Sequence, residues 1–429
     1  MGPSAANALP APVAPPTPLS LFTPCIPARP AHLTPIAIRG HTVVTALGDG
    51  RAALSNAVQS QRSGLQPLAQ ASISAAVGRI DRLDVEALPG HLTGWDCRAT
   101  RLAWRGLHSD EFAASVAAAM QRHGSTRVGL VMGTSASTVA VSELAYRHPA
   151  ANGGFPQALR VAALHSMHAV ALFCARVLQV DGPAVTISTA CSSSARAFGH
   201  AERWLRLKLV DAVVVGGVDA LCDSVLYGFH ALGLMAPDTC RPFDRQRCGI
   251  SVGEAAGFAL LERIEDAHHS DPLLLGYGES NDAHHMSSPQ PEGLGAERAL
   301  DDALARAGLT AADIDYLNLH GTATPQNDAV EAALVARRYS PQVHASATKG
   351  QTGHAMGAAG IVEAALCLLA LHSGWRSGSS GLTQIDPAFD PRFASQLRTT
   401  PQRVATQVAA SHSFGFGGNN GVLIFGGPR

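Results

Sequence analysis

Cys191 lies where a run of branched side chains gives way to small residues. Residues 185–189 (VTIST) are rich in β-branched side chains and predict a strand, while residues 192–209 carry apolar and charged side chains at helical spacing. The cysteine is therefore expected at a strand-to-helix turn, the geometry of a nucleophile elbow. Unpaired N–H groups and the macrodipole at a helix N-terminus favour an anion, so we expect this thiol to ionise more easily than a core thiol.

Two histidine motifs downstream favour a chemical role for Cys191. The alternative is a small buried hydrophobe, because most free cysteines pack in cores. Residues 318–324 (NLHGTAT) and residues 349–354 (KGQTGH) each place a histidine among small residues after a short predicted strand. These three sites together predict a constellation of Cys191, His320 and His354.

The elements that must position this constellation alternate between strands and helices in both halves of the chain. Each half runs strand, Gly-Thr, helix, strand, helix, strand and glycine pair, which indicates a duplicated α/β unit whose strand ends bring Cys191 to face both histidines. The expected strands are residues 42–45, 127–132, 185–189, 212–215, 316–319, 344–347, 407–413 and 422–425, and the expected helices are residues 51–61, 109–122, 161–178, 192–209, 329–337 and 357–371.

Composition sets the limits on fold and partners. A chain of 429 residues that is 46% hydrophobic and 15% charged can bury a large core. Its net charge of −1 gives no general field for nucleic acid or membrane, and no apolar run approaches the ~20 residues of a membrane helix. The eight cysteines form no C-x-x-C pair and follow no secretory leader, which indicates reduced thiols in a cytoplasm.

The chain divides into three expected segments. Residues 1–34 are rich in proline and alanine and predict a flexible extension. Residues 35–265 form the N-terminal half, which carries the nucleophile, and residues 266–429 form the C-terminal half, which carries the two histidines.

Five motifs in this order resemble the β-ketoacyl-acyl carrier protein synthases, closest to the elongating type of bacterial type II fatty acid and polyketide systems. The resemblance extends from about residue 43 to residue 425, and the motifs are residues 189–193 (TACSS), 241–244 (RPFD) with 253–254 (GE), 320–328 (HGTATPQND), 349–360 (KGQTGHAMGAAG) and 413–420 (SFGFGGNN). It implies a thiolase-like α/β fold of duplicated halves, with mixed sheets in a layered α-β-α-β-α arrangement. It also implies acyl carrier protein as partner, no cofactor, and a dimer, either of identical chains or with a related chain-length-factor-like subunit.

The residues fit the chemistry that this resemblance implies. A decarboxylating Claisen condensation needs a thiolate to hold one acyl unit as a thioester, and Cys191 supplies it. Loss of carbon dioxide from a malonyl thioester moves negative charge onto the thioester oxygen, and His320 and His354 are the candidate donors that stabilise it. The resemblance places the oxyanion hole at the backbone N–H groups of Cys191 and Phe416.

Two charged residues near these motifs have competing interpretations. Lys349 either tunes the active site or forms a structural ion pair with Glu363, and we favour the ion pair because a buried ammonium generally needs a carboxylate. Asp328 is expected to cap the helix that follows it.

Residues 280–286 (SNDAHHM) contain two histidines and an aspartate, which suggests a metal site, but the spacing of these residues does not support one. Adjacent histidines on an extended strand point to opposite faces, so we expect no metal site. The resemblance instead makes this segment a loop that moves with residues 414–418, with Asp282, His285 and Asn420 as gate candidates. The glycines around Phe416 supply the backbone freedom that a gate needs, whereas packing is the alternative for this ring.

Other features leave substrate and partner open. Residues 248–250 (CGI) replace a more usual Asp-Gly-Phe and, with residues 278–286, resemble the synthases of aryl-polyene pigment clusters. Arg241, Arg245 and Arg247 form the densest basic cluster near a motif, which either docks an acidic carrier helix or is a solvated charge run.

Two alternatives to the synthase remain open. One is a non-catalytic partner that shapes a chain-length pocket, and such a subunit typically lacks the cysteine. The other is a coenzyme A-dependent thiolase, which would carry a second cysteine near residues 413–420.

Overall fold

The structure is a computed structural model that describes residues 32–68 and 72–428. Residues 1–31 of the expected extension lie outside the described residues. From residue 32 onward the chain forms one compact unit.

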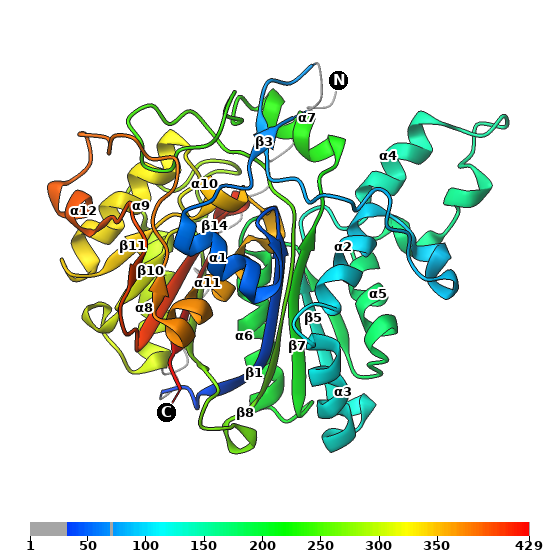
Figure 1. The fold of residues 1–429 in the computed structure, drawn as a ribbon, viewed down its shortest axis with the longest axis horizontal. Coiled ribbons are helices and arrows are strands. Elements are labelled where there is room, and N and C mark those ends of the chain that lie inside the picture. Colours follow the sequence, from blue (N-terminus) through cyan, green and yellow to red (C-terminus); the bar gives the residue numbers. More distant parts are fainter. Residues whose placement is uncertain (1–31, 69–71, 429) are drawn as a thin grey trace, which may run out of the picture. The chain divides into compact units, whose positions relative to one another are not determined.

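One continuous mixed sheet joins the two halves of the chain (Figure 1). Its order is β11-β10-β14-β15-β9-β1-β8-β7-β5-β6, with β2 beside β1. The link is β1, which pairs antiparallel with β8 along its length and with β9 through Ile36 and Ala37. The strands are β1 (Ile36–Thr45), β2 (Gly48–Asp49), β5 (Val128–Gly133), β6 (Ala184–Ile187), β7 (Ala212–Asp219), β8 (Ala255–Arg263), β9 (Leu273–Asn281), β10 (Tyr316–Asn318), β11 (His344–Ser346), β14 (Val408–Gly415) and β15 (Asn419–Gly426).

Alternating side chains give the inner strands two buried faces. On β7, Val214 packs into a core with helices α2, α3 and α5, whereas Val213 packs into a central core with α6 and α11. On β15, Leu423 faces the central core and Val422 faces a third core, under α8 and α9. The helices are α2 (Arg98–Leu107), α3 (Phe112–His123), α5 (Ala169–Leu178), α6 (Ser193–Arg206), α8 (Leu294–Ala307), α9 (Pro325–Arg338) and α11 (Ala359–Ser373).

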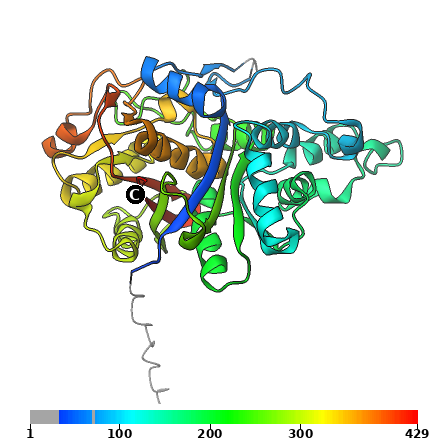
Figure 2. The ribbon, with the colours of Figure 1, turned by 60° about the horizontal axis from the view of Figure 1, so that its bottom comes forward.

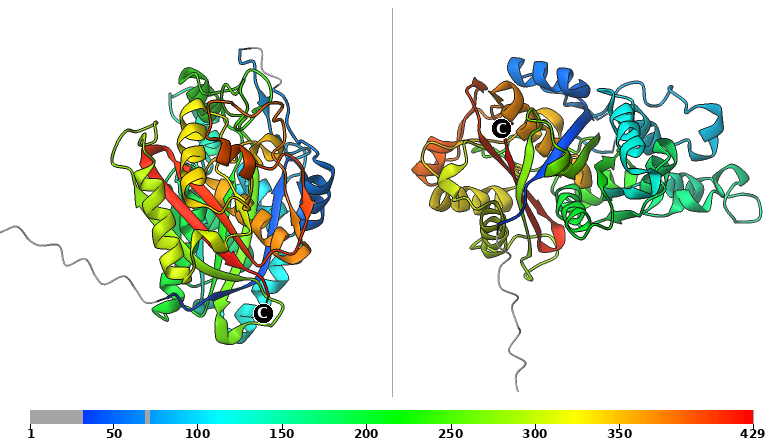
Figure 3. Two further views of the ribbon diagram at one scale, coloured as in Figure 1. Left: turned by 90° about the vertical axis from the view of Figure 1, so that its left-hand side faces the viewer. Right: turned by 90° about the horizontal axis from the view of Figure 1, so that it is seen from below.

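These three cores produce five layers. Helices α2, α3 and α5 cover the outer face of the first-half strands, α6 and α11 lie in the centre, and α8 and α9 cover the outer face of the second-half strands. Figure 2 shows β1 in blue between the two groups of strands, and the left view of Figure 3 shows the yellow helices outside the red strands β14 and β15. The expected thiolase-like α-β-α-β-α arrangement is confirmed, with β1 joining its strands into a single sheet.

Further elements complete the fold. They are α1 (Gly50–Ser60), α4 (Val139–Arg147), α7 (Asp223–Ala231), α10 (Lys349–Thr352), α12 (Pro391–Gln396) and the strand pairs β3 (Gln66–Pro67) with β4 (Ala76–Val77) and β12 (Trp375–Arg376) with β13 (Gln402–Arg403). Short 3-10 turns lie at Gly90–Trp95, Ser125–Arg127, Gln157–Leu159, Ala162–His165, Ile264–Asp266, Ala311–Asp313, Met356–Ala358 and Phe416–Gly418.

One expected helix is interrupted. Residues 161–178 were predicted as a single helix, but the structure has a 3-10 turn at Ala162–His165 and then α5. Ser166 separates them, because its hydroxyl accepts the N–H of His168 and its carbonyl accepts the N–H of Ala169. A serine side chain that binds nearby backbone competes with the helical hydrogen-bond ladder.

The central helix α11 is buried on all sides. Every residue from Ala359 to Leu371 is buried, which explains why its sequence is apolar without a polar face. Within the described residues, Met356–Ser373 is the one helical stretch whose length and composition would suit a membrane crossing, and 89% of it is buried inside the protein. The prediction that no run comes near this length is therefore wrong for this core helix.

Candidate active site

Cys191 lies at the sharp turn that the sequence predicts between β6 and α6. Ala190 has a φ of 53°, in the left-handed region that a residue with a side chain rarely adopts. The turn is held by Ser193, whose hydroxyl accepts the N–H of Thr189 at 2.9 Å and whose N–H donates to the carbonyl of Ala190 at 3.1 Å. The thiol is thus presented by strained backbone next to the first turn of α6.

Burial opposes the ionised form of Cys191, although less than it does for the buried thiols of Cys174 and Cys222. The residue is buried, and burial raises the pKa of the thiol to about 11. The Lys349 ammonium and the backbone N–H groups of Phe416 and Cys191 oppose this rise, while Glu363 adds to it. The expected advantage over a core thiol is present against Cys222, whose pKa burial raises to about 12, and against Cys174, whose pKa rises further, although the loss of solvent keeps Cys191 protonated at rest.

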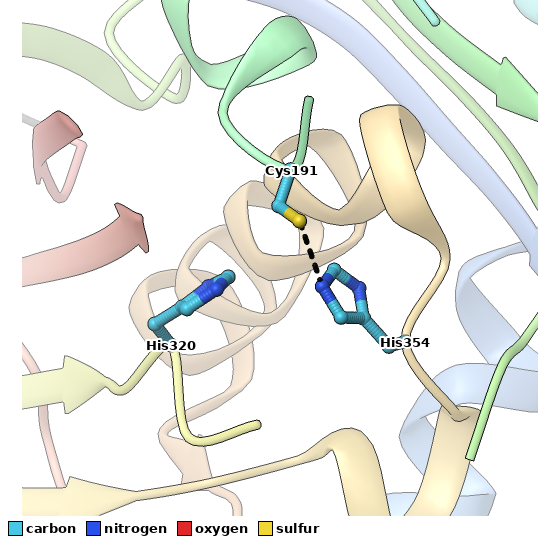
Figure 4. Close-up of side chains that lie close together, drawn as sticks. All are labelled: Cys191, His320 and His354. Atoms are coloured by element: carbon cyan, nitrogen blue, oxygen red, sulfur yellow. Dashed lines mark hydrogen bonds between the residues drawn. The ribbon is translucent and has the colours of Figure 1, made fainter. Parts of the chain in front are cut away.

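His354 is held almost entirely by backbone groups. Its N–H donates to the carbonyl of Ser251 at 2.7 Å, and its carbonyl accepts the N–H of Gly253 at 2.9 Å. The N–H of Met356 donates to ring atom Nδ1 at 3.2 Å. Because Nδ1 accepts, the ring proton is on Nε2, which lies 3.0 Å from the sulfur of Cys191 (Figure 4).

His320 is held instead by charged side chains. It follows β10, and the carboxylate of Glu331 on α9 accepts the N–H groups of His320 and Gly321, both at 2.8 Å. The Lys349 ammonium donates to the carbonyl of His320 and lies 3.3 Å from its Nδ1. A lysine donor at Nδ1 places the ring proton on Nε2, as in His354.

The two imidazole rings form a neutral pair beside the thiol. Their centroids are 5.5 Å apart with planes at 87°, and Figure 4 shows both rings next to Cys191. Burial lowers the pKa of each histidine well below its usual value, and the Lys349 ammonium lowers both further. At neutral pH the site therefore presents two uncharged rings, each carrying its proton on Nε2, with the Nε2–H of His354 directed at the sulfur.

The same three side chains have the donor atoms of a metal site. One donor atom from each of Cys191, His320 and His354 lies within 4.8 Å of the other two. A metal ion at Nε2 would force the ring proton onto Nδ1, where the Met356 N–H and the Lys349 ammonium already point. The donor set therefore does not fit a metal ion, and His284 and His285 belong to no such cluster among the described residues.

Lys349 and Glu363 form the ion pair that the sequence suggests. Both side chains are 3% exposed and their charged atoms are in contact. Glu363 on α11 also accepts the hydroxyl of Ser413 at 3.1 Å, and burial raises the pKa of its carboxyl to about 7 against the Lys349 charge. The pair is structural and also reaches the site, because the same ammonium contacts His320.

Asp328 does not cap its helix. The helix α9 begins at Pro325, with Thr324 at the capping position, so Asp328 lies in the first turn. Its buried carboxylate accepts the N–H of Phe243 at 2.7 Å and that of Ala323 at 3.2 Å. Burial raises the pKa of this carboxyl to about 7. The proline at the first helical position moved the start of the helix four residues before the predicted one.

Two of the three gate candidates meet at the 3-10 turn that carries Phe416. Asp282 accepts the amide of Asn420 at 2.7 Å, and its N–H donates to the carbonyl of Gly418 at 2.9 Å. His285 is exposed and its Nδ1 accepts the N–H of Ser287, so the structure does not place it with the other two. Gly417 has a φ of 77°, which a residue with a side chain would adopt only under strain.

A cavity of about 310 Å³ opens onto these groups. Phe416 contacts Phe229 across it, with ring centroids 5.9 Å apart. The other lining side chains are mainly apolar or uncharged, and they include Leu234, Ile250, Phe414 and Asn327. A mainly apolar cavity with a thiol and two imidazoles suits an acyl chain and its thioester.

The three arginines of the predicted basic cluster differ in exposure. Arg247 is 9% exposed, donates to Asp386 at 2.5 Å and stacks over Phe389 at 4.7 Å. Arg241 pairs with Asp238, and Arg245 is exposed. A docking partner can reach Arg245, whereas Arg247 serves the packing of its own chain.

Sequence reasoning found Lys349 but missed Glu331, which holds the backbone of His320. Glu331 lies three residues after Asp328 on the same face of α9, and this spacing of two acids behind a His-Gly-Thr turn was the available signal. His412 and Tyr339 complete a buried network with Glu331. Their separation of 73 residues along the chain gave no local signal.

Comparison with known proteins assigns the chain to a family. The chain matches the family models "Beta-ketoacyl synthase, N-terminal domain" over residues 99–267 and "Beta-ketoacyl synthase, C-terminal domain" over residues 273–381. It is 31% identical to nodulation protein E of Rhizobium meliloti (strain 1021), over 91% of this chain and 98% of that protein. It is 38% identical to the mitochondrial 3-oxoacyl-[acyl-carrier-protein] synthase of Arabidopsis thaliana, but over 57% of this chain and only 56% of that protein.

A solved structure extends the likeness to the fold. The ketosynthase ApeO of Xenorhabdus doucetiae, in complex with its chain length factor ApeC, superposes with a TM-score of 0.81 at 34% identity. The match covers 92% of this chain and 98% of that one. The chain belongs to the β-ketoacyl synthase family.

Proposed function

We propose that this protein condenses an acyl thioester with a malonyl-acyl carrier protein, with loss of carbon dioxide, to give a β-ketoacyl-acyl carrier protein. The observation that carries this proposal is the placement of one buried thiol beside two neutral imidazoles that both hold their proton on Nε2. The names of the relatives, which are 3-oxoacyl-[acyl-carrier-protein] synthases and ketosynthases, support the same reaction.

The first half-reaction loads Cys191. Its sulfur attacks the carbonyl of the acyl-carrier thioester, the carbon–sulfur bond to the carrier breaks, and the thiol proton passes to the departing carrier thiolate. The Nε2–H of His354 and the backbone N–H groups of Phe416 and Cys191 are the donors that stabilise the reacting thiolate. The same two backbone groups are the proposed oxyanion hole for the charge on the acyl oxygen.

The second half-reaction forms the new carbon–carbon bond. The malonyl carboxylate leaves as carbon dioxide, and the electron pair moves onto the thioester oxygen, where the Nε2–H groups of His320 and His354 stabilise it. The resulting carbanion attacks the acyl carbonyl on Cys191. The Cys191 thiolate then leaves and takes a proton from solvent, which returns the enzyme to its resting thiol.

A related subunit is the proposed partner for the edge of the sheet. Among the described residues, strand β6 ends the sheet and pairs with β5 alone, so one side of its backbone has no strand partner there. Helix α5 packs on this strand, and Met167 and Leu172 are 40% and 39% exposed there. An open strand beside exposed apolar side chains suits a second ketosynthase-like chain, either identical or of the chain-length-factor type with which ApeO is paired.

Three further proposals rest on the sequence. We propose that residues 35–265 and 266–429 are duplicates, supported by the parallel pairs β6-β5-β7 and β11-β10-β14, each followed by an antiparallel strand. The seven free cysteines among the described residues support a cytoplasmic location. Residues 248–250 and 278–286 support the aryl-polyene branch of the family.

The test is a mass-spectrometric condensation assay with acyl-loaded and malonyl-loaded carrier protein. Wild-type protein, alone or with a co-expressed partner subunit, is expected to form β-ketoacyl-carrier, and Cys191→Ala is expected to form none. Cys191→Ala that kept full condensation activity would overturn the proposal. A product made from acetyl-coenzyme A alone would instead support the thiolase alternative.

A further inference from the structure

A buried network of three side chains lies behind His320. The Nδ1 of His412 on β14 is 3.0 Å from the Glu331 carboxylate, and its Nε2 is 2.8 Å from the hydroxyl of Tyr339. All three side chains are 0% exposed. The reaction described above uses none of them, yet a buried polar network is costly unless every member is bound, so its complete bonding calls for an explanation.

The direction of each hydrogen bond follows from its partners. The Glu331 carboxylate already accepts the N–H groups of His320 and Gly321, so the His412 Nδ1 must donate to it. The His412 Nε2 then accepts the hydroxyl proton of Tyr339. Burial raises the pKa of this phenol far above its usual value, so the hydroxyl keeps its proton. The Tyr339 hydroxyl thus donates to His412, and His412 donates to the Glu331 carboxylate that holds the His320–Gly321 turn.

His412 also contacts His320 through an aromatic ring. The ring of Phe414 lies between them, 5.1 Å from the centroid of His412 and 5.8 Å from that of His320. The main chain and the ring of His320 are therefore both supported from the side of His412. Neither contact reaches Cys191 or the Met356 N–H that fixes His354.

We propose that His412 is a positioning residue for His320, acting by orienting the Glu331 carboxylate that holds the His320–Gly321 turn. The role rests on the proposed function, in which His320 stabilises charge only during decarboxylation. It predicts a split between the two half-reactions. Loss of the His412–Glu331 hydrogen bond should slow decarboxylation and leave the loading of Cys191 unchanged, whereas damage to the fold or to the loop of Phe416 would slow both.

Two substitutions separate the two hydrogen bonds of His412. His412→Asn keeps an amide N–H near the position of Nδ1 and loses the contact to Tyr339. His412→Gln extends its amide toward Tyr339 and loses the donor to Glu331. His344→Asn is the matched control, because this buried histidine lies on β11, two strands away from β14, and binds Ser377 and Gln402.

The two half-reactions are measured separately on the full chain, with its partner subunit where one is required. Intact-protein mass spectrometry follows acylation of Cys191 by acyl-carrier, and conversion of malonyl-carrier to acetyl-carrier without a primer follows decarboxylation. Because a displacement of about 1 Å can cost ~10²-fold in rate, His412→Gln is expected to slow decarboxylation by about 10-fold to 100-fold at unchanged acylation. His412→Asn and His344→Asn are expected to stay near wild type in both assays.

Each other outcome has a defined meaning. Decarboxylation at the wild-type rate in His412→Gln, or an equal loss of both half-reactions, would overturn the proposal. If His412→Gln does not fold, the double variant His412→Leu with Tyr339→Phe carries the test, because it removes the donor to Glu331 without leaving the Tyr339 hydroxyl unpaired and should slow decarboxylation alone; no loss there would overturn the proposal. Wild-type protein that decarboxylates no malonyl-carrier would overturn the proposed function itself, and the role of His412 with it.

Discussion

The two active-site histidines share one protonation state but are held in it by different kinds of group. His354 is fixed by main-chain groups, with Ser251 and Gly253 on its backbone and the Met356 N–H on its ring. His320 is fixed by side chains, with Glu331 on its backbone and Lys349 on its ring. Both rings are buried and neutral, and both have their proton on Nε2.

This difference shows which histidine the rest of the molecule can tune. Main-chain hydrogen bonds survive substitution of the residues that provide them, so the tautomer of His354 is difficult to change. The support of His320 depends on a buried ion pair and a buried carboxylate network, where loss of one member leaves another unsatisfied. The tautomer of His354, beside the nucleophile, is thus difficult to change by substitution. The tautomer of His320, which acts in decarboxylation alone, can be changed by substituting the side chains that hold it.

Removal of each ring gives the largest expected effect. His320→Ala should lower the decarboxylation rate by ~10²–10³, as does loss of one oxyanion donor in other enzymes, and should leave acylation of Cys191 intact. His354→Ala should lower both rates, because its Nε2–H also faces the sulfur of Cys191. Single-turnover acylation and primer-free decarboxylation of malonyl-carrier measure the two effects. Equal losses of acylation in the two variants would remove the distinction between the histidines.

Lys349→Met tests the side-chain support of His320. The variant leaves the Glu363 carboxylate buried without its cation, so we expect the free energy of unfolding to fall by about 3–5 kcal/mol. Decarboxylation should also fall, because Nδ1 of His320 loses the donor that fixes its tautomer. Chemical denaturation and the primer-free assay measure the two consequences.

A second substitution separates stability from catalysis. Lys349→Met with Glu363→Leu replaces the buried pair by apolar side chains, which is often neutral for stability, so unfolding should return toward wild type while decarboxylation stays low. Arg82→Met is the control, because its pair with Glu86 is exposed on both sides, 77% and 42%, and should contribute at most about 1 kcal/mol. Recovery of decarboxylation in the double variant would show that Lys349 acts on stability alone.

The features of the site that could be predicted from the sequence are those formed by residues close together in the chain. The turn at Cys191 follows from a branched run that meets a helical pattern, and His320 and His354 follow from short strands that end in small residues. The alternation of Val213 and Val214 between two cores is likewise visible as an apolar run on β7. The alternation of strands and helices could be predicted because these patterns repeat in both halves, whereas the layered arrangement was implied by the family resemblance.

The remaining features depend on contacts between distant segments. The pKa of Cys191 is raised by burial, which outweighs the Lys349 ammonium and the backbone N–H groups that lower it. Asp328 accepts the N–H of Phe243, which lies 85 residues away in the chain, and does not cap its own helix. In the sequence, His412 is a single histidine within a predicted strand. Its role depends on contacts with Tyr339 and Glu331, which only the fold brings beside it.

The smallest expected effect concerns ionisation of the nucleophile. The pKa of Cys191 is raised to about 11, so its thiolate fraction should grow about tenfold per pH unit below that value, and alkylation by iodoacetamide should rise in step from about pH 6 to about pH 10. No inflection is expected near pH 6.5, because the pKa of each histidine is lowered well below this value and both rings stay neutral.

The same alkylation curves separate the two histidines. A hydrogen bond to a charged group contributes about 1.5–3 kcal/mol, so His354→Ala should raise the apparent pKa of Cys191 by about 1–2 units and slow alkylation at every pH below it. His320→Ala should leave the curve in place, because its ring is held toward Lys349 and has no hydrogen bond to the sulfur among the described contacts. An inflection near pH 6.5 that disappears in His354→Ala would mean that this ring takes up a proton beside the thiolate, and the backbone-locked neutral tautomer would then be wrong.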